Sequence, residues 1–117
     1  MITLSLPFPP SANRLWRAVR GRQIKSAEYR AWLLEAQAAI TAARVTGSMP
    51  GAYHLEIHAT RPDWRARDLD NILKPISDAI AAAGLVINDS KAVSILAAWS
   101  PEPPVKGGAI TVHLRPA

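Results

Sequence analysis

The sequence contains no cysteine, and none of its apolar stretches approaches the length of a membrane span. Without cysteine the chain has no disulfides, no thiolate zinc site and no cysteine nucleophile. A spanning helix needs about 20 mostly apolar residues. The first ten residues also lack the basic region and the long apolar run of a signal peptide. We therefore expect a protein of the cytoplasm with no membrane partner.

The size and charge of the chain set further limits. A length of 117 residues fits a single domain covering positions 1–117. Hydrophobic residues make up 49% of the chain, a share that is typical of a folded core and argues against disorder. The net charge of +5 favours a polyanionic partner such as nucleic acid. Net charge alone does not decide this point, so the distribution of the charges must.

Apolar periodicity predicts six elements. Alternation predicts strands at 2–6, 53–59 and 110–114, and a fourth strand is expected at 93–99. Helical spacing predicts one helix that follows a Ser26 N-cap and ends near Gly47, and a second helix that ends near Gly84. The order β-α-β-α-β-β indicates an α+β domain with two helices packed on a small mixed sheet. Pro75 requires either that the second helix starts after Asp70 or that it is kinked.

Two basic segments carry most of the unbalanced positive charge. Residues 11–25 are expected to form a long loop that contains five cations and no acid. We interpret it as an arm that binds DNA phosphates, with Trp16 available for base contact. The alternative is a solvated loop with Trp16 folded onto the core. The second basic segment, 61–67, leads into an acidic stretch. The candidate DNA-binding residues are Arg14, Arg17, Arg20, Arg22, Lys25, Arg65 and Arg67.

An acidic cluster stands out in this basic chain. Asp68 and Asp70 lie two residues apart, Lys74 follows four residues later, and Asp89 comes after a helix-length segment. Mg²⁺ prefers one or two carboxylates together with waters and substrate phosphates, and a lysine can act as a point charge on phosphate. The alternative is that the acids are ordinary residues at a helix start and in a turn. Capping needs only one acid, however, so the pair favours metal-assisted chemistry on a phosphate backbone.

Two other patterns invite a different interpretation. His54, Glu56 and His58 alternate in a predicted strand, but the two histidines would lie about 13 Å apart and cannot share one ion. The outward face of a strand accounts for them better. Pro62-Asp63 followed by Asp89-Ser90-Lys91 matches the loose Pro-Asp…Asp-x-Lys pattern of restriction-type nucleases. That pattern requires its acid and lysine on a strand, whereas Asp89-Ser90 is typical of a turn.

Four segments carry a family resemblance: Pro9-Pro10-Ser11-x-Asn13-x-x-Trp16-Arg17, Arg67-Asp68-Leu69-Asp70-Asn71 with Lys74, Asp89, and Lys106-Gly107-Gly108. Through them the chain resembles the RusA family of Holliday junction resolvases, which is common in prophages, over nearly its whole length. It implies a RusA-like fold, Asp68, Asp70 and Asp89 as catalytic Mg²⁺ ligands, and Lys74 as a residue needed for cleavage. Where the family often has two adjacent aspartates, this chain has Asn88-Asp89.

The resemblance and the residues together predict a Mg²⁺-dependent endonuclease that cuts four-way DNA junctions in recombination and repair. The resemblance also implies a homodimer, which suits two symmetric nicks because a C2 dimer supplies two equivalent sites. One alternative is a decayed nuclease that binds junctions without cutting them, although the intact carboxylates argue against decay. Another is a small-molecule phosphohydrolase, but a single phosphate does not need two basic segments.

Overall fold

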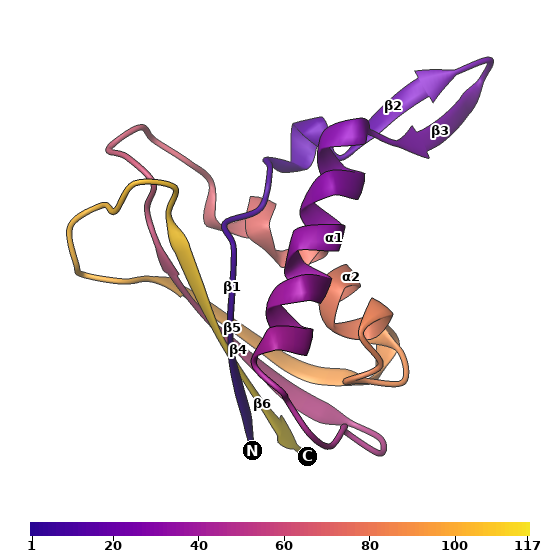
Figure 1. The fold of residues 1–117 in the computed structure, drawn as a ribbon, viewed down its shortest axis with the longest axis vertical. Coiled ribbons are helices and arrows are strands. Elements are labelled where there is room, and N and C mark those ends of the chain that lie inside the picture. The colour runs from indigo at the N-terminus through magenta and orange to yellow at the C-terminus, as the bar shows by residue number, and fades with distance from the viewer.

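The computed structural model of the protein describes residues 1–117, apart from the side chain of Ala12, and has an α+β fold (Figure 1). The predicted β-α-β-α-β-β order is confirmed once a small additional hairpin is set aside. The strands are β1 (Ile2–Leu6), β2 (Trp16–Val19), β3 (Arg22–Lys25), β4 (Tyr53–Thr60), β5 (Ala92–Trp99) and β6 (Ala109–Pro116). The helices are α1 (Ala27–Ala42) and α2 (Leu73–Ala82), with short 3-10 segments η1 (Ala12–Arg14), η2 (Leu69–Ile72) and η3 (Asp89–Lys91).

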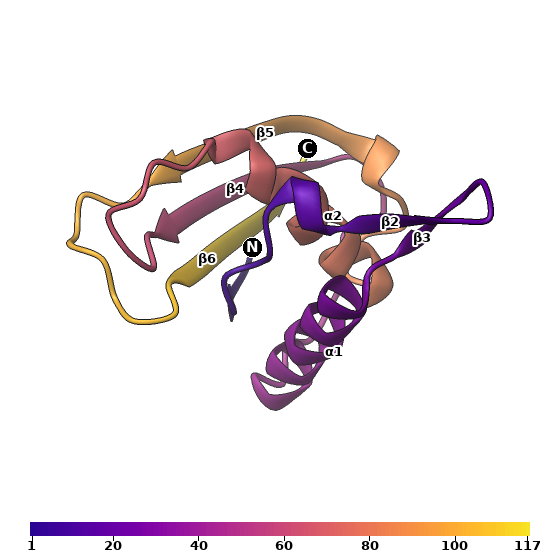
Figure 2. The same cartoon turned by 90° about the horizontal axis from the view of Figure 1, so that it is seen from above.

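Four strands form a mixed sheet in the order β1-β6-β4-β5. The β4–β5 pair is parallel, whereas β6 runs antiparallel to both β1 and β4. Both helices lie on one face of this sheet, and the other face is left bare (Figures 1 and 2). Strand β4 therefore alternates strictly between buried residues and partly exposed ones. The two chain ends lie side by side at one end of the sheet (Figure 1). None of the described helices has the length and apolar character needed to cross a membrane.

The core lies between the helices and the covered face of the sheet. The predicted stripe on α1 is confirmed at Tyr29, Trp32, Ala36 and Ile40, which are all buried. On α2, Ile76 and Ile80 are buried in the same core. Each fully buried side chain of this kind stabilises the fold by about 1.5–3 kcal/mol relative to its exposed form.

The helix ends follow local rules. Ser26 caps α1 as predicted, because its Oγ accepts a hydrogen bond from the Tyr29 backbone N–H at 3.0 Å. The helix ends at Ala42, before Gly47, and Arg44 takes the left-handed conformation with φ of 53°. Pro75 is the third residue of α2, where its missing N–H has no intrahelical acceptor to lose. The first of the two alternatives for Pro75 is therefore confirmed.

The prediction of a long loop over residues 11–25 was wrong. The segment contains η1 and a two-stranded hairpin in which β2 and β3 pair from Trp16↔Lys25 to Val19↔Arg22. Its turn residues Arg20 and Gly21 have φ of 51° and 76°, which suits the tight turns that match strand twist. The sequence signal for this hairpin was weak, because arginine is not one of the usual residues at the first position of such a turn. The hairpin projects from the body of the molecule (Figure 1), and nearly all its side chains are exposed.

Candidate active site

Asp68 and Asp70 flank Leu69 at the start of η2. Leu69 packs against the core, while both aspartates are exposed, so the alternation turns the two carboxylates to solvent. Asp68 occupies the N-cap position with extended backbone, yet its side chain makes no capping hydrogen bond. Neither carboxylate forms an ion pair with any described side chain. The two acids are therefore free to bind a cation, and a capping role does not account for Asp68.

Lys74 lies between two carboxylates at the first turn of α2. Its Nζ donates a hydrogen bond to Asp78 Oδ1 at 2.9 Å and lies 4.0 Å from Asp89 Oδ2. The hydrogen bond to Asp78 raises the Lys74 pKa above its ordinary value, and the charges of Asp78 and Asp89 add to this effect. Lys74 is thus held as a cation beside Asp89.

Asp78 and Tyr29 were not among the predicted site residues. Tyr29 is buried in the core, and its hydroxyl donates to Asp78 Oδ2, so that the Asp78 carboxylate bridges Tyr29 and Lys74. Burial raises the pKa of Tyr29, and the hydrogen bond and charge of Asp78 raise it further, so the phenol keeps its proton. The spacing from Lys74 to Asp78 was visible as an i,i+4 pair, but nothing local pointed to Tyr29.

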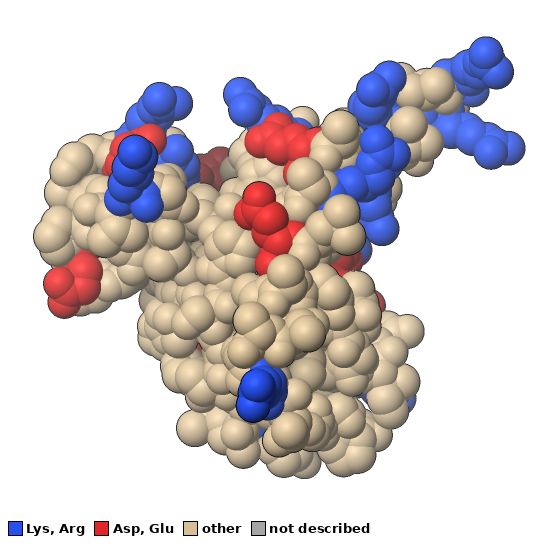
Figure 3. All heavy atoms as spheres, viewed as in Figure 1, with Lys and Arg blue, Asp and Glu red and all other residues tan. Residues whose placement is uncertain are grey.

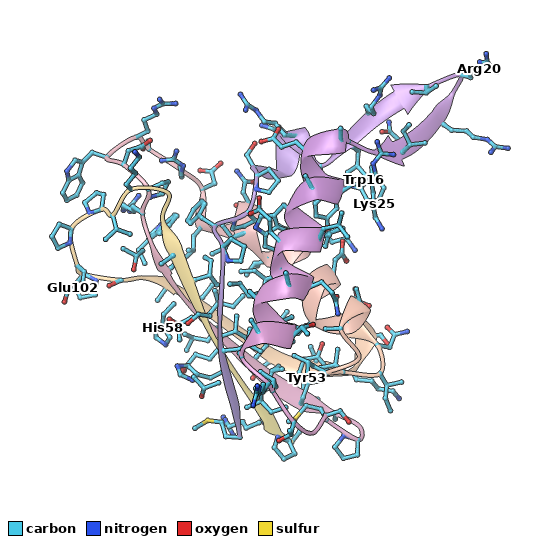
Figure 4. All side chains as sticks on the ribbon, viewed as in Figure 1. Trp16, Arg20, Lys25, Tyr53, His58 and Glu102 are labelled. Atoms are coloured by element: carbon cyan, nitrogen blue, oxygen red, sulfur yellow. The ribbon has the colours of Figure 1, made fainter. Side chains whose placement is uncertain are left out.

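The base of the hairpin and Lys74 line the same hollow. This hollow of about 380 Å³ is lined by residues from the hairpin, from α2 and from the loop that leads into η3. Trp16 stands edge-on to Tyr29 with ring centroids 6.2 Å apart, so it contacts the core while remaining partly exposed. Figure 4 shows Trp16 and Lys25 at the hairpin base next to α1, and Arg20 at its tip. The lining residues are Trp16, Lys25, Lys74, Asp78, Ala81, Ile87, Asn88 and Asp89.

Asn88 has a local structural role in this hollow. Its side-chain oxygen accepts a hydrogen bond from the Ser90 backbone N–H at 2.9 Å and caps η3, where Asp89 is the first residue. An aspartate at position 88 could make the same cap. Asn88 therefore fixes the turn that presents Asp89 without adding a charge of its own.

Asp68 lines a second, larger groove of about 490 Å³. One wall is the stacked pair Phe8 and Trp99, whose ring centroids lie 6.2 Å apart, and Arg61 lies over the Trp99 ring at 4.2 Å. Gly108 contacts Phe8 so closely that a Cβ at this position would lie 2.8 Å from the ring. Arginines line the groove beside the aromatic wall. Its charged lining residues are Arg14, Glu28, Arg65, Arg67 and Asp68.

Asp63 is neutralised by its neighbours and does not resemble a metal ligand. Arg67 donates to both Asp63 oxygens, and the Arg65 backbone N–H donates to one of them at 2.9 Å. These contacts, led by the Arg67 hydrogen bond, lower the pKa of Asp63 to about 2. Asp89-Ser90-Lys91 forms η3 rather than a strand. The geometry therefore gives no support to the Pro-Asp…Asp-x-Lys pattern.

The predicted DNA-binding cations differ in whether they form ion pairs within the chain. Arg17, Arg20, Arg22 and Lys25 are exposed on the hairpin and form no ion pair with the described side chains. Arg14 lies 3.9 Å from Glu28, and Arg67 is held by Asp63. Arg65 is largely exposed, and its Nε lies 3.7 Å from Asp63 Oδ2. Figure 3 shows positive side chains gathered on the hairpin and on the loop between β4 and η2, with acidic side chains between these two regions.

The three predicted metal ligands are not gathered into one tight cluster. Asp68 lines the groove, whereas Asp89 lines the hollow. The two cavities are near each other, because Asn71 of the groove and Lys74 of the hollow are only about one helical turn apart in the chain. Since Mg²⁺ usually takes only one or two carboxylates and completes its shell with water and phosphate, the hard oxygen donors present here fit that ion.

The chain is similar to known endonucleases over almost its full length. Residues 7–115 match the model of the family described as endodeoxyribonuclease RusA. Crossover junction endodeoxyribonuclease RusA of Escherichia coli strain K12 is 34% identical over 112 residues, which cover 96% of this chain and 92% of the relative. The protein of the same name from Enterobacteria phage 82 is 34% identical over 111 residues, covering 95% and 91%. This chain belongs to the RusA endodeoxyribonuclease family.

Proposed function

We propose that this protein is a Mg²⁺-dependent endonuclease that resolves four-way DNA junctions by paired, symmetric nicks. The observation that carries the proposal is the pair of free, exposed carboxylates of Asp68 and Asp70. Lys74, four residues after Asp70, lies beside Asp89. The names of the relatives add the substrate, a crossover junction. The relative from phage 82 supports a role in phage or prophage recombination.

Asp68, Asp70 and Asp89 would hold the metal. When bound, Mg²⁺ activates a water and neutralises charge at the scissile phosphate. Lys74 supplies a fixed ammonium that stabilises the negative charge developing on the phosphate oxygens in the transition state. Asp78 and Tyr29 hold this ammonium in place from the side of the core.

The two basic regions would bind DNA on either side of these acids. The exposed hairpin cations suit the phosphate backbone, and the aromatic wall of the groove suits an unstacked base. Their separation on the surface fits a branched substrate better than a small phosphate ester (Figure 3).

A homodimer would place two such sites on one junction. Strand β5 is an edge strand, and its exposed side chains include Val93, Ile95 and Leu96. The other edge strand, β1, exposes the polar residues Thr3 and Ser5 between buried aliphatic residues. Because edge strands with exposed apolar side chains pair with further chains, β5 is the surface on which we place the second copy.

A nicking assay tests the proposed function. The protein would be incubated with a synthetic four-way junction or a matched duplex, with Mg²⁺ or with EDTA. We expect Mg²⁺-dependent nicks in opposite strands of the junction, and loss of cleavage with retained junction binding in Asp68→Asn, Asp70→Asn and Asp89→Asn. Wild-type nicking by all three variants would refute the metal assignment. Junction binding without any metal-dependent cleavage by the wild type would identify a non-catalytic binding protein.

A further inference from the structure

Three metal-ligand side chains converge on the bare face of the sheet, away from the helices. Glu56 and His58 are alternate residues of β4, and His113 of β6 lies directly opposite Glu56 in the register. One ligand atom from each lies within 4.8 Å of the others, and no other group of this kind is formed by the described residues. His58 Nε2 is 3.1 Å from Glu56 Oε2, and the rings of His58 and His113 meet edge-on with centroids 5.7 Å apart.

A third strand orients one of these ligands. Thr3 of β1 pairs with His113, and Thr3 Oγ1 lies 2.9 Å from His113 Nδ1. With Nδ1–H donating to the hydroxyl, the Nε2 of His113 carries the free lone pair that a metal requires. Metal-binding histidines commonly have such a partner on the second ring nitrogen. His54, the remaining histidine, is instead 2.5 Å from Ser94 Oγ through its Nδ1 and is not part of the group.

The donor set identifies the kind of ion. Two imidazoles and one carboxylate suit Zn²⁺, whereas Mg²⁺ prefers oxygen ligands alone. Ligand atoms around a tetrahedral Zn²⁺ are about 3.4 Å apart, and the 3.1 Å between Glu56 Oε2 and His58 Nε2 is close to this separation. Their side chains are 46% and 44% exposed, so an ion can enter from solvent.

We propose that Glu56, His58 and His113 form a second metal site, which binds Zn²⁺ or a similar divalent transition-metal ion. The site lies on the sheet face opposite the two helices, of which α2 carries Lys74, as the position of His58 in Figure 4 shows. Three protein ligands leave the fourth position to an exchangeable water. The ion would join β4 to β6 and, through Thr3, would make β1 part of the same network.

Binding to the metal-stripped protein tests the site. Zn²⁺ titration should give one transition-metal site by calorimetry, and Co²⁺ should give visible absorption of a low-coordinate N/O site. Because the ion binds only the folded sheet, Zn²⁺ at about 100 times its Kd should raise the Tm by roughly 10 °C. No Zn²⁺ binding by the wild type would overturn the proposal.

The variants locate the ion. His58→Gln/His113→Gln should abolish the Zn²⁺ signal, and Glu56→Gln, which keeps the shape of the side chain, should weaken it. Thr3→Val should weaken binding about 10- to 100-fold without removing it. His54→Gln is the matched control, because it changes a histidine on the same face and strand outside the group, and it should bind like the wild type.

Two outcomes would place the ion elsewhere. Retained binding in His58→Gln/His113→Gln with an unchanged Kd would refute these ligands. Loss of the site in Asp68→Asn/Asp70→Asn/Asp89→Asn, together with retention in the histidine double variant, would assign Zn²⁺ to the acidic segment instead. We expect the triple aspartate variant to keep its Zn²⁺-dependent rise in Tm.

Discussion

Lys74 and Asp78 form a 2.9 Å ion pair one helical turn apart on α2, and this pair holds the ammonium 4.0 Å from Asp89. The pair has two possible consequences of very different size. An exposed i,i+4 pair stabilises a helix by only a few tenths of a kcal/mol, about 0.2–0.5. A fixed donor to a developing negative charge is worth on the order of 10²–10³ in rate.

The first prediction separates these consequences. Lys74→Ala should lower single-turnover junction cleavage by about 10²–10³ at saturating Mg²⁺, with little change in Tm or junction affinity. Lys74→Arg should rescue poorly, because a planar fork does not replace a compact ammonium aimed at one oxygen. Cleavage by Lys74→Ala at the wild-type rate would leave the lysine with only its helix-stabilising role.

The second prediction concerns Asp78 as a positioning residue. Asp78→Asn keeps the shape but removes the charge that fixes Lys74, so kcat should fall about tenfold while KM for the junction is unchanged. Tyr29→Phe should have a smaller effect, because it removes only the hydrogen bond to the other Asp78 oxygen. Glu35→Gln, on the exposed side of α1, is the control. If Asp78→Asn lowered the Tm but left kcat unchanged, Asp78 would serve stability alone.

Local sequence rules predicted most of the fold but not the contacts between distant elements. Ser26, the buried stripe on α1 and the position of Pro75 follow from capping, periodicity and the chemistry of proline, which act within a few residues. The contact of Tyr29 with Asp78 depends instead on how two helices pack. The approach of His113 to Glu56 depends on the strand order β1-β6-β4-β5, which no local pattern specifies.

The third prediction tests the hairpin as a DNA-binding arm. Arg17→Ala/Arg22→Ala should weaken junction binding and reduce the slope of log K against log salt by about one unit per lost phosphate contact. Arg17 and Arg22 are both exposed, whereas Arg14 lies 3.9 Å from Glu28. Arg17 and Arg22 are therefore better targets than Arg14 for this test. Arg115→Ala, at the C-terminal end of β6, removes one charge far from the hairpin and should leave the slope unchanged. A slope that is the same in the double variant and in the wild type would exclude the hairpin from backbone contact.

The fourth prediction follows from the low pKa of Asp63. Its folded pKa of about 2 lies below the ordinary value of 3.8, so its contribution to stability is present above about pH 4 and is lost as the pH falls through 2. Asp63→Asn should therefore lower the free energy of unfolding at pH 7 but make little difference at pH 2. Urea unfolding at the two pH values measures this, with the exposed Glu102→Gln as control. An equal effect of Asp63→Asn at both pH values would argue against the ion pair with Arg67.

The last prediction tests β5 as the surface that binds a second copy. Ile95 is 46% exposed on this edge strand, beside Val93 and near the free edge of the sheet. In a C2 interface each substitution occurs twice, so Ile95→Glu would place two carboxylates in an apolar contact. Sedimentation at micromolar concentration should then find a dimer for the wild type and a monomer for Ile95→Glu. Leu34→Glu is the matched control, since Leu34 is an aliphatic residue that is 72% exposed on α1, away from β5, and its variant should remain dimeric. On a junction, the monomeric variant should make its two nicks in separate events, because one protomer carries only one site. A wild type that sediments as a monomer, or an Ile95→Glu variant that remains dimeric, would remove β5 from the interface.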